Sequence, residues 1–444
     1  MTAPLGPTLR IAITGAGMGG LATALALARQ GFTQIDVYEA ARDLGFVGAG
    51  IQIAPNLSRQ LQQLGAWETH MAPDAVEMDN VSIRGGNTDE ELVRLDVTHI
   101  LERYGQPHRV AHRAALANAL YEACKAVAPR IRFHFGTSVI NVDFDTPRLC
   151  IRAWGEEGDG RWINADVVIG ADGVKSVVRK CMLARHGEED DAEDTGQAAY
   201  RIMLRRDQLA HDPELLSLLE SNTTTRWIGA GRQIIAYPIS NHTILNIATT
   251  QPDANFAAEP SATWTTRADK SAMLQVYADF CPRVVSLLRL VPTGDVCEWK
   301  LRVHRPLRTW VEGSVTLVGD ACHPTLPHLG QGAAQAIEDG VVLAFMMGKL
   351  VNIKELNTGL LVFERLRKAR TEFLVDEAAA SGRALLLADP EAQAARDAAF
   401  QRVKEGGPNP DKWVDRAVTD YLYGFDCIAD AEARYRECVV KVMS

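Results

Sequence analysis

The sequence predicts an α/β protein that ends in a helical segment. The prediction rests first on a β-α-β start: an apolar run at 9–14 leads through a glycine-rich turn into an Ala- and Leu-rich stretch at 21–30, and a second apolar run follows at 35–38. Such a unit fits within roughly thirty residues. The prediction rests second on short buried-strand patterns at 165–169 and 315–318, each followed by a glycine-containing turn.

The remaining elements follow from periodicity and turn residues. Helices are expected from the Pro55-Asn56 turn to near Gly65, at 116–127, from about Gly332, and over most of the chain after Glu355. Alternating apolar and polar residues predict strands, the first three of them antiparallel, at 131–135, 139–144, 149–154, 198–204, 233–237 and 243–248. The acidic run 188–194 is expected to form an exposed, solvated loop at a change of domain.

Composition excludes several classes of function. The 444 residues are 47% hydrophobic and 23% charged, which is ordinary for a globular protein with a large core. A net charge of −9 argues against a nucleic-acid partner, because phosphate binding needs a basic surface. Eight scattered cysteines without a CxxC pair predict neither a metal site nor a disulfide framework. Without an apolar run of about 18 residues or a secretory pattern at the start, a cytoplasmic protein with no membrane span is expected.

The turn at 15–20, with the sequence GAGMGG, matches the dinucleotide-binding fingerprint between a strand and a helix. Gly15 permits the tight turn, Gly17 lets the backbone approach a pyrophosphate, and Gly20 lets helix and strand pack closely. The helix N-terminus offers free N–H groups to the phosphates. Glu39, at the end of the second strand, is placed to accept hydrogen bonds from the adenosine ribose. This motif alone does not separate FAD from NAD.

Two later motifs separate the two cofactors. Gly170-Ala171-Asp172-Gly173 resembles the DG motif of flavoprotein hydroxylases, and the segment 319–324, GDACHP, resembles their GDAxHP motif. Together with GAGMGG they occur in the order typical of that family. The chain therefore resembles the class A flavoprotein monooxygenases, which share the fold of para-hydroxybenzoate hydroxylase. The likeness covers roughly residues 8–350 and includes segments similar to salicylate hydroxylases and to fungal relatives that dearomatise phenols.

The resemblance implies FAD as the cofactor. The implied contacts to FAD are Gly50 in a loop over the flavin (48–51), Arg113 at a helix start, Asp172, Asp320 at the ribitol, and Gly332 and Ala333 at the N-terminus of a flavin-facing helix. The sequence contains one nucleotide fingerprint, which fits a class in which NADH or NADPH visits the site transiently without a Rossmann domain of its own.

The resemblance also implies the domain organisation. A Rossmann-like FAD-binding domain is expected to be interrupted by a mixed-sheet substrate domain and followed by a helical C-terminal segment. The expected boundaries are 1–75, 103–185 and 290–350 for the FAD-binding domain, 76–102 and 186–289 for the substrate domain, and 351–444 for the C-terminal segment. The oligomeric state is left open between monomer and homodimer.

The expected substrate is a small phenol, oxidised with O2. Transfer of an electrophilic oxygen needs an electron-rich ring, and a cation or hydrogen-bond donors at the phenol oxygen favour the phenolate. By resemblance to the salicylate hydroxylase-like segments, Arg201 is expected to anchor the phenolate or a carboxylate, and Tyr237 to hydrogen-bond it. His328, just before the flavin-facing helix, is expected to touch substrate or reduced flavin or to stand directly behind them, whereas His323 is interpreted as structural.

Several activities stay open at the level of sequence. The preferred one is hydroxylation of a salicylate-like phenol, with or without loss of the carboxylate, and the same residues suit oxidative dearomatisation of an acylated phenol. An FAD oxidase or reductase without monooxygenase activity is a further alternative. A nicotinamide-dependent dehydrogenase would use GAGMGG for NAD, but it leaves the motifs at 170–173 and 319–324 unexplained.

Overall fold

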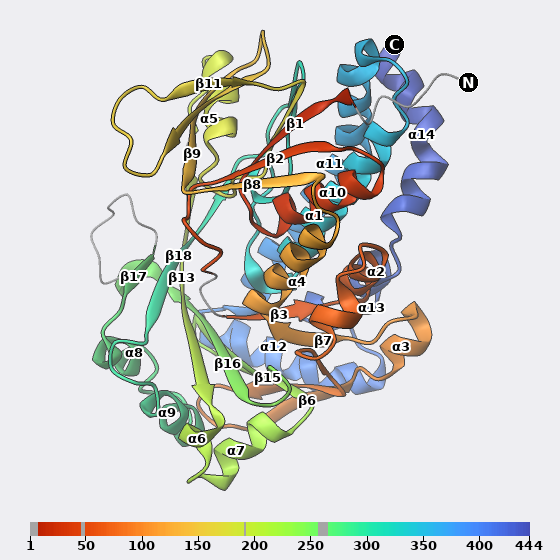
Figure 1. The fold of residues 1–444 in the computed structure, drawn as a ribbon. Coiled ribbons are helices and arrows are strands. Elements are labelled where there is room, and N and C mark those ends of the chain that lie inside the picture. Colours follow the sequence, from red (N-terminus) through yellow and green to blue (C-terminus); the bar gives the residue numbers. More distant parts are fainter. Residues whose placement is uncertain (1–7, 46–48, 191, 256–264) are drawn as a thin grey trace.

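The structure of the protein is a computed structural model that describes residues 8–45, 49–190, 192–255 and 265–444 (Figure 1). Its first layer is a sheet, here called the nucleotide sheet, in which the neighbouring strands from β20 to β8 run parallel. The order across this sheet is β19 (Val311–Glu312), β20 (Val315–Leu317), β12 (Val167–Gly170), β1 (Arg10–Thr14), β2 (Gln34–Glu39) and β8 (Ile131–Phe135). The predicted β-α-β start is confirmed, because β1 and β2 pair through the crossover helix α1 (Met18–Arg29).

The second layer is a mixed sheet, confirming that part of the predicted fold class. Its order is β17 (Thr265–Arg267), β18 (Cys297–His304), β13 (Ala192–Arg205), β16 (Ile244–Pro252), β15 (Arg232–Ile239), β14 (Thr223–Gly229), β5 (Asn80–Gly85) and β6 (Glu91–Asp96). Strands β14 and β5 are parallel and the other pairs are antiparallel. Short helices accompany this sheet at the bottom of Figure 1, namely α6 (Arg206–Leu209), α7 (Pro213–Glu220), α8 (Lys270–Val276) and α9 (Pro282–Arg289).

Smaller elements complete the fold. One antiparallel sheet consists of β9 (Thr137–Asp143), β10 (Arg148–Ala153) and β11 (Arg161–Asn164), and another of β3 (Gly50–Ile53), β7 (Arg109–His112) and β4 (Val76–Glu77). The further helices are α2 (Pro55–Gln63), α3 (His99–Tyr104), α4 (Arg113–Ala126), α5 (Val177–Arg185), α10 (Gly332–Gly348), α11 (Leu356–Leu385), α12 (Pro390–Arg402), α13 (Arg416–Tyr423) and α14 (Cys427–Met443). The C-terminal part is therefore mostly helical, as predicted.

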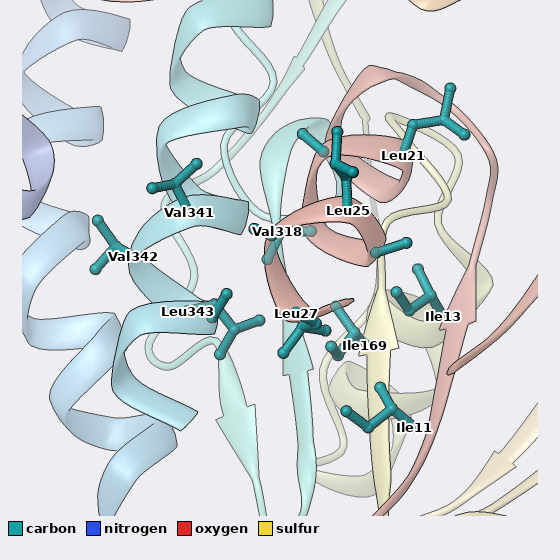
Figure 2. Close-up of a cluster of buried hydrophobic side chains, with 14 of the residues drawn as sticks. Ile11, Ile13, Leu21, Leu25, Leu27, Ile169, Val318, Val341, Val342 and Leu343 are labelled. Carbon is teal, nitrogen blue, oxygen red and sulfur yellow. The ribbon is translucent and has the colours of Figure 1, made fainter. Parts of the chain in front are cut away.

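The main core lies between the nucleotide sheet and the helices α1 and α10 (Figure 2). Helix α1 is buried without a break from Gly20 to Ala28, as expected for a helix that is apolar all round. Helix α10 crosses it closely, since a Cβ on Gly340 would lie 2.5 Å from Thr23 Oγ1. The first turns also meet, because a Cβ on Gly19 would lie 3.3 Å from the Cβ of Ala336. The core therefore fixes the N-termini of both helices side by side.

One local prediction was wrong, and another holds only in part. Residues 131–135 do not join an antiparallel sheet, because this strand, β8, pairs parallel with β2 after helix α4 returns the chain to the sheet edge. The acidic run 188–194 is exposed at Glu188, Glu189, Glu193 and Asp194, as predicted, but not at Asp190. Asp190 has a side chain only 6% exposed, since it pairs with Arg179 and His304, and strand β13 already begins at Ala192.

The predicted domain boundaries stay a prediction. Strands β5 and β6 lie in the same mixed sheet as β13, β15 and β16. Strand β18 lies in it too, although the expected boundary at 290 assigns its residues to the FAD-binding domain.

In the part of the chain described here, the helices are too short or too polar for any of them to cross a bilayer.

A buried histidine makes the stability depend on pH. His108 is 2% exposed, and burial lowers its pKa from 6.5 to about 4. The unfolded chain therefore binds a proton as the pH falls below 6.5 while the folded chain does not, so stability is present at neutral pH and is lost towards pH 4. From pH 7 to pH 5 this group should remove about 2 kcal/mol of unfolding free energy.

The measurement is urea unfolding of His108→Leu and of the wild type at both pH values. The variant should lack this part of the acid destabilisation, whereas replacement of the exposed His99 by glutamine should leave it in place. Equal pH dependence of wild type and His108→Leu would contradict the assignment.

Candidate active site

A cavity of about 380 Å³ lies between the glycine-rich turns of the nucleotide sheet and the face of the mixed sheet. Of the predicted site residues, it is lined by Gly17, Gly50, Arg113, Arg201, Tyr237, Asp320, His328, Gly332 and Ala333. Its volume is in the range of small-molecule pockets. Gly15, Gly20, Glu39 and Asp172 stand behind this lining, and each of them shapes one of the turns.

The first turn has the shape that a dinucleotide cradle requires. Gly15 has φ +92°, and a Cβ there would lie 2.5 Å from the carbonyl oxygen of Ala171; a Cβ on Gly20 would lie 2.0 Å from that of Gly15. At Gly17 a Cβ would meet nothing within 4 Å, so the turn is open on the cavity side. Gly17 caps helix α1 without a side-chain hydrogen bond, which leaves N–H groups available for an anion.

Glu39 fixes this turn from the second strand. Its carboxylate accepts hydrogen bonds from the backbone N–H of Ala16 and of Ala41, both at 2.8 Å. The sequence did not predict this role, because Glu39 and Ala16 are far apart in the chain. They come into contact only because β1 and β2 pair side by side. Binding of the adenosine ribose by Glu39 stays a prediction.

The turn at 170–173 is closed by Asp172. Its carboxylate accepts from the Ser176 hydroxyl at 2.5 Å and from the N–H groups of Val177 and Val178, so it caps helix α5. Ala171 and Gly173, on either side of it, line the cavity. The carboxylate of Asp172 is therefore already occupied. The predicted contact with FAD would come from the rest of this turn and not from the Asp172 carboxylate.

Arg179 joins this turn to the turn at 319–321. Its guanidinium donates to the carbonyl oxygens of Val174 at 2.6 Å and Ala321 at 3.0 Å, and it pairs with the buried Asp190. A guanidinium can do this because it carries five donors in a fixed plane. Arg179 thus sets the distance between two cavity-lining turns, a role that the sequence indicated only by its position after the DG motif.

The third turn brings Asp320 and helix α10 to the cavity. Asp320 is exposed and lines the cavity together with Gly319. Helix α10 begins at Gly332 with neither a side-chain cap nor an acidic residue in its first turn, and Gly332 and Ala333 line the cavity. An uncapped helix N-terminus favours negative charge. The uncapped start of α10 therefore suits an electron-rich or anionic ring edge. The Asp320 carboxylate suits the hydroxyl groups of a polyol chain, from which it can accept hydrogen bonds.

The turn that carries Asp320 is held by the buried carboxylate of Asp339, on the side away from the cavity. Asp339 accepts from the backbone N–H of Gly319 at 3.0 Å, and its carboxylate lies 2.5 Å from His323 Nε2 and 2.8 Å from Arg367 Nε. His323 is thus structural in its contacts, as interpreted from sequence. Cys322, His323 and Asp339 approach closely enough to suggest a metal site, but Arg367 already supplies the cation that Asp339 binds.

The wall opposite these turns begins at Gly50. Its N–H donates to Asn246 Oδ1 at 2.6 Å, and a Cβ there would lie 2.5 Å from Tyr237 Cε2 and 2.6 Å from its hydroxyl. Glycine is therefore required where β3 meets the mixed sheet. Arg113 starts helix α4 beside this strand and lines the cavity. Gly48, at the start of the predicted loop over the flavin, lies outside the described residues.

Arg201 and Tyr237 face the cavity from strands β13 and β15. Arg201 stacks on Trp299 at 4.8 Å, and burial with the nearby charge of Arg113 lowers its pKa to about 10, so it stays cationic at neutral pH. Burial raises the pKa of Tyr237 far above its usual range, and the charge of Arg201 offsets this only in part. Tyr237 therefore keeps its proton and is a hydrogen-bond donor.

His328 also lines the cavity. Its Nε2 lies 3.1 Å from Gln197 Oε1 and its Nδ1 lies 3.4 Å from Gln233 Nε2. These partners assign the neutral tautomer with the proton on Nε2. Burial and the charge of Arg226 lower the pKa of His328 to about 4, so the ring is neutral at pH 7. It can position groups in the cavity, and it does not carry a positive charge to them.

A Rossmann-type cradle that opens into a cavity floored by a mixed sheet suits a dinucleotide-dependent oxidoreductase, and the three turns fit FAD. Comparison with known proteins supports this class. A family model described as an FAD binding domain matches residues 8–378. The FAD-dependent monooxygenase ntnJ of a Nectria species is 34% identical over 402 residues, covering 90% of this chain and 91% of that protein.

Two further relatives extend the comparison. The 3-hydroxybenzoate 6-hydroxylase 1 of Aquipseudomonas alcaligenes is 34% identical over 363 residues, covering 81% of this chain and 85% of that protein. The solved structure of a salicylate hydroxylase substrate complex shares the fold, with a TM-score of 0.76 at 23% identity over 96% of this chain and 98% of that chain.

The chain belongs to the FAD-binding domain family, and within it to the FAD-dependent monooxygenases of the aromatic hydroxylase class. This assignment confirms the resemblance drawn from the three glycine-rich motifs. It also decides against the nicotinamide-dependent dehydrogenase considered above, because the GAGMGG turn belongs to an FAD domain that matches 8–378.

Proposed function

We propose that this monooxygenase binds a phenol as its phenolate, with Arg201 and Tyr237 at the phenolate oxygen, and that one oxygen atom of O2 is transferred to a ring carbon while the other is reduced to water. The observation that carries the proposal is an unpaired cation in the cavity. Within the residues that the structure describes, no carboxylate pairs with Arg201, although it is partly buried beside Trp299 and faces the same cavity as the Tyr237 hydroxyl. A partly buried cation without a counterion favours an anionic ligand.

The cofactor contacts follow from the three turns. We assign the pyrophosphate of FAD to the open N-terminus of α1 at Gly17, the ribitol to Asp320, and the electron-rich edge of the flavin to the N–H groups of Gly332 and Ala333. FAD supplies the redox chemistry and the activated oxygen. The protein supplies position and charge: Arg201 favours the phenolate, Tyr237 donates a hydrogen bond to it, and the buried floor excludes water from it.

The electron donor proposed for the cycle is NADH or NADPH. We place no binding residue for it, since the chain carries one nucleotide fingerprint and that one serves FAD. The similarity to a 3-hydroxybenzoate 6-hydroxylase supports a phenolic acid as substrate. Oxidative dearomatisation of an acylated phenol would use the same anchor, and the mass and ultraviolet spectrum of the product separate the two outcomes.

The test measures the pKa of a phenol bound to the FAD-loaded protein, together with phenol-stimulated oxidation of NADH and NADPH. We expect the bound phenol to titrate about 1–3 pH units below its value in water, because a cation within contact distance favours the charged form. Tyr237→Phe keeps the ring and removes one hydrogen bond, so its loss in product formation should be only about 0.5–1.5 kcal/mol. An unshifted phenol pKa and no stimulation by any phenolic acid would refute the proposal.

A further inference from the structure

A second cavity, here called the edge cavity, lies at the β6 edge of the mixed sheet. It has a volume of about 230 Å³ and, among the residues that the structure describes, shares none of its lining with the candidate active site. Strands β5 and β6, helix α3 and the segment 413–423 contribute most of its walls. A dry cavity of roughly 150 Å³ can hold a benzene molecule, so the edge cavity has room for one substituted ring.

The inner wall of the edge cavity is apolar and aromatic. Trp413, Tyr423 and Tyr104 line it, and the rings of the two tyrosines meet edge to face with centroids 5.7 Å apart. Besides His108, the other buried residues of the lining are Val81, Val97, Ile100 and Thr419. Aromatic rings favour edge-to-face and offset contacts with further rings, so this wall favours an aromatic ligand.

His108 lies in this wall without a partner for its ring nitrogens. It is 2% exposed, and its ring centroid lies 5.4 Å from that of Trp413 and 6.1 Å from that of Tyr423. Within the described ranges, neither Nδ1 nor Nε2 makes a hydrogen bond, and burial lowers the pKa of the ring to about 4. The ring is therefore neutral at pH 7, with one N–H donor and one acceptor nitrogen.

An unpaired buried imidazole is unfavourable unless something outside the chain pairs with it. A buried donor or acceptor without a partner has lost its hydration, whereas a leucine at position 108 would have none to lose. An ordered water needs about two to four polar partners, and the surroundings of His108 are mainly apolar and aromatic. A molecule that combines a ring with one hydrogen-bonding group therefore suits this wall better than water.

The charges at the mouth of the edge cavity balance one another. Asp420 lies 2.7 Å from Arg103 and 3.9 Å from Arg416, and Asp96 accepts hydrogen bonds from the hydroxyl and the N–H of Thr98. Among the described residues that line the cavity, no buried one carries a charge. A charged ligand would lose its hydration inside without gaining a counterion, so an uncharged ligand is favoured.

We propose that the edge cavity is a second binding site, for a small uncharged aromatic molecule that carries one hydroxyl or ring N–H group. The hydroxyl or N–H group forms a hydrogen bond with the imidazole of His108, and the ring packs against Trp413 and Tyr423. The site is independent of the proposed phenolate anchor, because Arg201 and Tyr237 line the other cavity.

The probe for this site is benzyl alcohol, which has a ring, one hydroxyl group and no charge. It is titrated into the FAD-loaded protein labelled with nitrogen-15 at histidine, and the ring nitrogens of His108, assigned by comparison with His108→Leu, are followed by NMR. We expect the signal of the acceptor nitrogen to shift and to saturate, because the hydroxyl group donates a hydrogen bond to it.

Two related compounds test the chemical class. Benzoate, which has the same ring with a charged group, should leave the His108 signals unchanged, because the cavity offers its carboxylate no counterion. Cyclohexylmethanol has the same hydroxyl group on a saturated ring, and it should bind about two- to tenfold more weakly than benzyl alcohol because the contacts between aromatic rings are lost.

Cavity-filling variants show where the probe binds. Leu95→Trp fills the edge cavity from β6 and leaves His108 in place, so it should abolish the shift. Val414→Trp fills the cavity from another part of its wall, which covers a failure of Leu95→Trp to fold. Leu101→Trp is the matched control, since Leu101 is 49% exposed on α3 and outside the lining; it should keep the shift.

Three results would overturn the proposal. The first is the absence of any shift in the wild type up to the solubility of benzyl alcohol, as expected if His108 is paired with water alone. The second is a shift that persists in the folded cavity-filling variants, since the alcohol would then act from elsewhere in the protein. The third is an equal response to benzoate, which would exclude an uncharged ligand as the preferred class.

Discussion

Arg201→Ala is expected to lower the rate of product formation, as kcat/KM, by about 10²–10³-fold, because it removes the one donor that carries a full charge at the phenol oxygen. The stacked guanidinium beside Trp299 has no carboxylate to neutralise it within the described ranges, so its charge is available to the substrate. FAD content should not change, since Arg201 lies on the mixed sheet and the glycine-rich turns lie across the cavity. The measurement is product formed per NADH or NADPH consumed, with hydrogen peroxide assayed in parallel.

Two variants check that the effect belongs to the cation in the cavity. Arg201→Lys keeps the charge and loses the planar stacking on Trp299, so it should recover part of the lost rate. Arg205→Ala removes an arginine from the exposed end of the same strand, where it pairs with Asp207, and should leave the rate unchanged. Wild-type coupling in Arg201→Ala would instead assign the phenol oxygen to Tyr237 and Asn246.

The sequence was sufficient for the cofactor cradle because glycine requirements are local. The clash of a Cβ on Gly20 with the carbonyl oxygen of Gly15 belongs to the turn itself, so the spacing of the motif already contains it, whereas a Cβ on Gly15 would meet Ala171 in the neighbouring turn at 170–173. The order of the motifs then identified the family. Arg201, Tyr237 and Asp320 were placed in one cavity through that resemblance, and their roles stay predictions that the variants above test.

The rest could not be read from the chain because it depends on pairing between distant strands and helices. Residues 131–135 alternate like any half-buried strand, and only the crossover by α4 makes β8 a parallel edge strand. Arg179 is one arginine among many until its contacts with Val174 and Ala321 show that it joins two turns. Asn246 and Gln233 were recognised as cavity-lining residues only when the register of β15 and β16 placed them on the same face of the mixed sheet.

Asp339→Asn is expected to lower the free energy of unfolding by about 3–5 kcal/mol, because it leaves a buried arginine short of its counterion. Asp339 is 0% exposed; burial alone would raise its pKa, but the charges of His323 and Arg367 outweigh burial and lower it to about 2. Arg367, itself 1% exposed, would keep the carboxylate of Glu338 at 2.8 Å, which it shares with Arg370, and the neutral Gln335 Oε1 at 2.7 Å.

The loss of Asp339 should also reach the cofactor. Its carboxylate holds the N–H of Gly319 and the ring of His323, and these two residues flank Asp320 in the cavity-lining turn. Urea unfolding with saturating FAD measures the stability, and retention of FAD on a desalting column measures the effect on the turn. Asp166→Asn is the control, since its pair with Arg10 is partly solvated, with side chains 28% and 49% exposed, and should change stability by less than about 1 kcal/mol. If Asp339→Asn loses no more than this control, the buried pair does not support the fold, and the rigidity of the Asp320 turn must come from Arg179.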